Sequence, residues 1–138
     1  MAVKTISNSD AIRLVREMWP ALSFAWVPDQ NFLMPVIEEV IALIQVSGVK
    51  DFQRYGESWD CDDFALWLHA WVNQHHPPNE DKFPWAFGEV TGSRFKNIHE
   101  QHSLNICLSA DGVYLIEPQT YGFWVADPKQ DRVWAIKL

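Results

Sequence analysis

The stretch WDCDDFALWLHAWVNQ, residues 59–74, places a cysteine at the start of an apolar repeat with helical spacing. The apolar positions that share one helical face are Phe64, Ala65, Leu68 and Trp71. This repeat predicts a helix from Cys61 to about Gln74, with the cysteine in its first turn. Because the first turn of a helix has free backbone N–H groups, it favours a thiolate at Cys61.

Two helical repeats precede this stretch. The first follows the capping residues 7–10 and ends before Pro20. The second begins near Pro35, which suits a first helical turn, and ends at Ser47-Gly48. Residues 22–31, which lie between the two repeats, are predicted to be extended or loop.

The hydrophobic period changes after Pro77-Pro78, which end the third helix. Four later segments are typical of strands: residues 85–90, 103–108, 113–116 and 133–138. Helices followed by strands predict an α+β fold, with N-terminal helices packed on a small antiparallel sheet. The chain of 138 residues is long enough for one core and too short for two, so we predict a single domain over residues 1–138.

Composition excludes several classes of partner. The formal net charge of −7 leaves no basic surface for a phosphate backbone, so neither nucleic acid nor an anionic membrane is an expected partner. No apolar signal-peptide core and no membrane-spanning stretch is visible, so we expect a cytoplasmic protein. In that compartment Cys61 and Cys107 are expected to be reduced. The sequence does not indicate an oligomeric state.

The sequence has five histidines, and one of them is the best candidate for a base beside Cys61. His69, His75 and His76 belong to the third helix or its end, too close in sequence to return to the helix start. His99 lies in a loop. His102 opens a predicted strand and alternates in phase with the apolar residues that follow it, so we select His102.

The turn at residues 109–112 predicts a hairpin, in which opposite residues share a face. If the turn leaves Leu108 opposite the first residue after it, His102 opposes Gln119 and Glu117 becomes a diagonal neighbour of His102. If the last two residues of the turn form the loop instead, Glu117 moves two pairs away from His102. The contact between His102 and Glu117 would then need a bulge or a strong twist.

These residues suggest a site for acyl transfer to a thiol. Such a site needs a nucleophile, a base within hydrogen-bond reach and a third group that orients the base, and Cys61, His102 and Glu117 meet that need. Gln119 is a candidate donor to an oxyanion or to the backbone. The alternatives are that Cys61 is a small buried core residue and that Gln119 is a solvated strand end.

Three aspartates surround the thiol and oppose its ionisation. A hard cation bound by Asp62 and Asp63 would offset the negative charge of Asp60, Asp62 and Asp63. Oxygen ligands of this kind suit calcium or manganese. The alternative is that acidic residues in a first helical turn only stabilise the helix, by about 0.3–1 kcal/mol each. The remaining ligands of such a metal cannot be placed from the sequence.

Three short segments carry a resemblance: residues 59–65, residues 102–105 and residues 117–119. They resemble the papain-like cysteine protease domain that forms the C-terminal part of the Marasmius oreades agglutinin, over roughly residues 24–119. The resemblance implies that Cys61 is the nucleophile, His102 the general base and acid, and Glu117 the orienting carboxylate. It further implies dependence on calcium or manganese, with Asp62 and Asp63 as the candidate ligands.

The chain departs from this pattern in two respects. No lectin domain precedes the protease-like region, so carbohydrate targeting is not expected, and Glu117 stands where ordinary papain-like enzymes have asparagine. The resemblance implies a cysteine peptidase or related thiol hydrolase that cleaves amide bonds of a peptide or protein substrate. The alternative is a catalytically inactive binding or structural module, for example from a phage, that retains the same scaffold.

Overall fold

The computed structural model describes residues 4–96 and 98–138. Met1–Val3, which belong to the N-terminal segment in which no signal-peptide core is visible, lie outside the described residues. The helices are α1 (Asn8–Met18), α2 (Ile37–Ser47) and α3 (Cys61–His75), with short 3-10 turns at Val49–Asp51 and Gly56–Ser58. The strands are β1 (Lys4–Ser7), β2 (Phe24–Trp26), β3 (Asn31–Met34), β4 (Phe87–Ser93), β5 (His102–Ser109), β6 (Gly112–Ile116), β7 (Phe123–Val125) and β8 (Arg132–Lys137).

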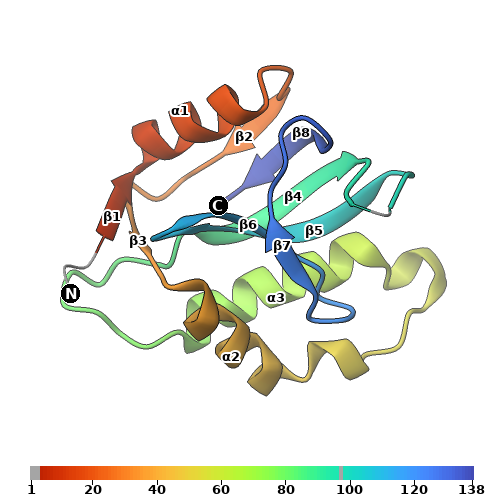
Figure 1. Cartoon of the computed structure of the whole chain (residues 1–138). Helices are drawn as coiled ribbons and strands as arrows, with labels where there is room; N and C mark the ends of the chain where they lie inside the picture. Colours follow the sequence, from red (N-terminus) through yellow and green to blue (C-terminus); the bar gives the residue numbers. More distant parts are fainter. Residues whose placement is uncertain (1–3, 97) are drawn as a thin grey trace.

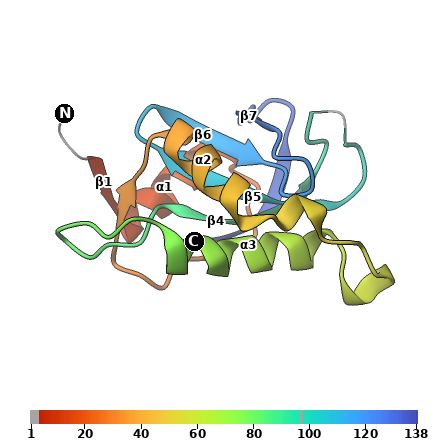
Figure 2. The same ribbon diagram turned by 90° about the horizontal axis from the view of Figure 1, so that it is seen from below.

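A six-stranded sheet forms the centre of the fold. Its strand order is β2-β8-β4-β5-β6-β7, and every neighbouring pair is antiparallel except β2 with β8. A second sheet holds only β1 and β3. Helix α1 covers one face of the large sheet, and α2 and α3 cover the other (Figure 1, Figure 2). The predicted α+β class with a mainly antiparallel sheet is therefore confirmed.

Each face of the sheet has its own apolar cluster. The cluster beneath α1 includes Val15, Val90, Leu104, Ile106 and Leu108. The cluster beneath α2 and α3 includes Val40, Phe64, Leu68, Phe87 and Cys107. Both faces of the central strands are therefore buried, and burial of apolar side chains on both sides fixes their position.

The three predicted helices are confirmed to within a few residues. Ser7 caps α1, where its side chain accepts a hydrogen bond from the Asp10 N–H. Gly48 follows α2 with φ at 71°, a left-handed conformation that suits glycine at a helix end. Among the described residues, none of the helices combines the length and the hydrophobicity needed to cross a membrane.

The predicted hairpin is present, and its register is the first of the two considered. Leu108 pairs with Val113, and Ala110-Asp111 form the loop. The paired part of β6 ends at Ile116, so Glu117 stands just beyond it. This places Glu117 at the end of the sheet where β5 begins.

One buried amide fixes α3 against the sheet. The Asn105 side-chain nitrogen donates to the Ala65 carbonyl oxygen at 2.9 Å and to the Gly88 carbonyl oxygen at 3.0 Å. Asn105 lies on β5 and is fully buried, so these bonds form in a region without competing water. The early turns of α3 are thereby held at a fixed distance from β4 and β5.

Candidate functional site

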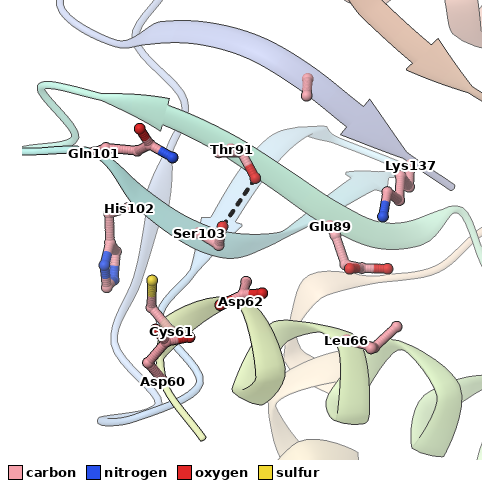
Figure 3. A pocket seen from close by; sticks show the side chains of 11 residues that line it. Asp60, Cys61, Asp62, Leu66, Glu89, Thr91, Gln101, His102, Ser103 and Lys137 are labelled. Atoms are coloured by element: carbon pink, nitrogen blue, oxygen red, sulfur yellow. Dashed lines mark hydrogen bonds between the residues drawn. The ribbon is translucent and has the colours of Figure 1, made fainter. Parts of the chain in front are cut away.

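A cavity of about 570 Å³ lies between the start of α3 and one end of the sheet (Figure 3). The residues that line it are Asp60, Cys61, Asp62, Leu66, Glu89, Thr91, Gln101, His102, Ser103, Ala135 and Lys137. Most of these side chains are polar or charged. The cavity is therefore suited to a ligand that forms hydrogen bonds rather than to an apolar one.

Cys61 is the first residue of α3, as predicted, and it is half-buried at the cavity wall. Figure 3 shows its sulfur pointing to the side of the cavity on which His102 lies. Cys107 is a contrasting thiol: it is fully buried in β5, and burial raises its pKa far above the usual range. Both cysteines are free thiols.

Glu117 holds the imidazole of His102. The His102 Nε2 and Glu117 Oε2 atoms lie 2.5 Å apart, and the two side chains are only 12% and 10% exposed. The Gln119 backbone N–H donates to the other carboxylate oxygen, Glu117 Oε1, at 3.0 Å. Within the described residues, His102 Nδ1 makes no hydrogen bond, so this nitrogen is left for the cavity.

His102 reaches the cavity because it is the first residue of its strand. By alternation it belongs to the face that carries Leu104 and Ile106, which packs beneath α1. Ser103, one residue later, points toward α3 and bonds to Thr91 across the strands at 2.9 Å. Because His102 is at the end of the sheet, its side chain lies beside the cavity, although strand alternation assigns it to the opposite face.

Gln119 lies elsewhere. Its side chain lines a separate hollow with Lys96, Ile98, Thr120 and Trp124, and it is not among the residues that line the Cys61 cavity. Donation by this side chain to an oxyanion or to the backbone stays a prediction, and Gln119 does not line the Cys61 cavity. The contribution of Gln119 to the site is its backbone N–H, which holds Glu117.

The aspartates at the helix start divide into two roles. The Asp63 carboxylate accepts the Asp60 backbone N–H at 3.1 Å in a capping box, so it serves the helix rather than the cavity. Ligand atoms of Asp60, Cys61 and Asp62 lie within 4.8 Å of one another. Calcium or manganese binding at Asp62 and Asp63 stays a prediction; the group whose ligand atoms lie within 4.8 Å of one another contains Asp60 and Asp62 but not Asp63.

The carboxyl groups of Asp60 and Asp62 influence each other's pKa. A hydrogen bond with Asp62 lowers the pKa of Asp60, while the same bond, burial and neighbouring negative charge raise the pKa of Asp62. The two carboxyl groups therefore do not ionise independently of each other.

Several cavity residues were not predicted. Glu89 and Thr91 alternate along β4, so both point to the face that α3 covers. Lys137 of β8 is the strand partner of Glu89. The Glu89 carboxylate is bonded to His69 of α3, with 2.7 Å between Oε2 and Nδ1. The alternation of polar residues at 89 and 91 was a sequence signal that both side chains share one face of the sheet. No comparable signal in the sequence indicated Gln101.

No protein-family model matches the sequence, and no curated protein matches it. Two solved structures share its fold. One is a PSL1a–E64 complex, with a TM-score of 0.80, 19% identity and coverage of 97% of this chain and 51% of that one. The other is the Polyporus squamosus lectin bound to the human-type influenza-binding epitope Neu5Aca2-6Galb1-4GlcNAc, with a TM-score of 0.77, 19% identity and coverage of 97% and 49%.

The second of these structural neighbours is a lectin by name. The neighbours contradict the predicted membership in the papain-like cysteine proteases, the predicted cysteine peptidase and the predicted peptide or protein substrate. At 19% identity the likeness establishes the fold, and this chain spans about half the length of the chains it matches.

Proposed function

We propose that this chain is a ligand-binding domain, that its binding site is the cavity at the start of α3, and that Cys61 is a reactive thiol within that site. The observation that carries the proposal is the side-chain arrangement. Figure 3 shows Cys61 pointing to the side of the cavity on which His102 lies. The Glu117 carboxylate is bonded to Nε2 of the same imidazole. An accessible thiol, a base and an orienting carboxylate thus meet at the wall of a polar cavity.

Each group supports the thiol in a different way. The free Nδ1 of His102 can accept the thiol proton, and Glu117 stabilises the imidazolium that results. The N-terminus of α3 favours the negative sulfur. Cys61 begins a helix that packs on a mainly antiparallel sheet, and this supports a papain-like arrangement of the helix and the sheet. We propose that arrangement for the fold, without a peptidase function.

The experiment is alkylation of the protein by iodoacetamide near neutral pH, followed by mass spectrometry of the two cysteines. We expect Cys61 in the folded protein to react several-fold faster than Cys61 in the urea-unfolded chain, because folding brings His102 beside it. Cys107 should react only on unfolding. If folding slows the reaction of Cys61, the cavity does not contain a reactive thiol.

The second candidate concerns the ligand class. The lectin neighbours favour a carbohydrate, and the hydroxyl and amide side chains of Thr91, Ser103 and Gln101 match the hydrogen bonds that sugar hydroxyls form. Since this chain spans only about half of that lectin, the glycan of the lectin is not thereby placed in this cavity. The carboxylates of the cavity also disfavour the acidic sialic-acid unit.

Calorimetric titration tests this candidate. We expect the neutral disaccharide Galb1-4GlcNAc to bind at least as tightly as the sialylated epitope, and Gln101→Ala to weaken binding roughly tenfold through lost hydrogen bonds. Gln53→Ala, at a position outside the cavity lining, is the matched control. Absence of binding heat with both sugars would exclude them as ligands of this chain.

A further inference from the structure

Glu89 occupies a fixed position in the cavity wall. Figure 3 shows it near Leu66 and Lys137, at a distance along the wall from His102 and Cys61. Its carboxylate is held from α3 by His69, at 2.7 Å, and the two side chains are only 13% and 14% exposed. Glu89 therefore cannot turn away from the cavity without losing this bond.

The charge around the cavity is mainly negative. Asp60, Asp62 and Glu89 line it with carboxyl groups, and Lys137 is the one lysine or arginine among the lining residues. Lys137 is paired with Glu89 in strand register, but it is exposed and, within the described residues, forms no ion pair with Glu89. A concave site lined by one sign of charge concentrates the field and attracts the opposite charge.

We infer that Glu89 is a specificity-determining residue, which selects a ligand with a cationic ammonium or guanidinium group for this cavity. Glu89 Oε1 makes no hydrogen bond within the described residues, so it is available to accept from such a group, while His69 occupies Oε2. The exposed side chain of Leu66 lies beside Glu89 and can cover the aliphatic part of the ligand. The inference rests on the proposed binding function of the cavity.

Two thiol reagents of opposite charge test the inference at Cys61. A trimethylammonioethyl and a sulfonatoethyl methanethiosulfonate each form a disulfide with the thiolate and release methanesulfinate, so their chemistry is the same. The rate constant of the cationic reagent at Cys61 is divided by that of the anionic reagent, and this ratio is divided by the same ratio measured with the free thiol 2-mercaptoethanol. The corrected ratio reports the charge around Cys61 in the cavity. We expect the cationic reagent to be favoured by roughly tenfold at low salt.

Two substitutions should move this ratio in opposite directions. Glu89→Gln is expected to lower it roughly threefold, and Lys137→Gln is expected to raise it by a similar factor. Glu17→Gln removes a carboxylate from exposed α1 on the other face of the sheet and is expected to leave the ratio unchanged. An unchanged ratio in Glu89→Gln would overturn the inference.

A second measurement does not depend on the thiol. Agmatine, which carries one primary ammonium group and one guanidinium group, is titrated into Cys61→Ser and into Cys61→Ser with Glu89→Gln, and binding is followed by NMR. We expect several-fold weaker binding to the double variant. If neither reagent modifies Cys61, the reactive-thiol proposal fails, and equal agmatine affinity in the two variants overturns the role of Glu89.

Discussion

Replacing His102 by alanine is expected to slow alkylation of Cys61 by roughly 10- to 100-fold at neutral pH. His102 is the one histidine among the residues that line the cavity, and its imidazole is bonded to the Glu117 carboxylate. Without the imidazole, Cys61 loses the group that we propose accepts its proton. The rate is measured by mass spectrometry of the Cys61 peptide at several times of reaction with iodoacetamide.

Two further variants sharpen this result. Glu117→Gln keeps the shape of the side chain but removes its charge, so a smaller decrease is expected, in the same direction. His99→Ala removes an exposed histidine that does not line the cavity and should leave the rate within about twofold of wild type. Equal rates for His102→Ala and His99→Ala would show that His102 does not activate Cys61.

Gly88→Ala is expected to lower the free energy of unfolding by about 3 kcal/mol or more. A Cβ atom at Gly88 would stand 1.8 Å from the Lys137 carbonyl oxygen, 2.8 Å from its carbonyl carbon and 2.9 Å from the Leu138 Cα. All three atoms belong to the backbone, so no side chain can move aside. The alanine must therefore separate β4 from β8, which urea unfolding would measure.

Gly122→Ala is the matched control for this change. The nearest atom to a Cβ at Gly122 is the Thr120 side-chain oxygen at 3.2 Å, and that side chain can shift. We expect a loss of at most about 1 kcal/mol. If the two alanine variants unfold at the same urea concentration, β4 and β8 do not approach as closely as the structure places them.

The elements with strong local signals were predictable from the sequence. The apolar repeat that follows Cys61 gave α3, because its period of about 3.6 residues does not depend on the rest of the fold. The turn at 109–112 predicted the hairpin but left two registers open, and the structure has the one in which Leu108 pairs with Val113. From that register the contact between His102 and Glu117 followed.

Short strands at the sheet edges were not predictable. β2 and β7 have three residues each, too few to show alternation, and their partners lie elsewhere in the sequence. The role of Asp63 was left open for a different reason: whether a first-turn acidic residue caps the helix or faces a cavity depends on its rotamer. Glu89 lines the cavity because α3 packs on β4, and this tertiary contact could not be predicted from the sequence.

The expected function was a different kind of error. The His102 and Glu117 side chains are bonded and Cys61 lines the same cavity as His102, but the same fold occurs within about half of a solved lectin chain, and a fold does not carry one activity. The chemistry of the three side chains is therefore a property to be measured at the site. The ligand is decided by the cavity wall, to which Gln101, Glu89 and Lys137 contribute.

The parallel pair of β2 and β8 bears on the order in which the protein folds. Phe24 stands opposite Ala135 and Trp26 opposite Lys137, so an early segment finds its partner only when a very late one is present. Closing so long a loop carries a large entropic cost, whereas α3 and the β5–β6 hairpin form from neighbouring residues. On the ribosome, helix α3 and this hairpin can therefore assemble first, while β2 waits for the last strand to leave the exit tunnel.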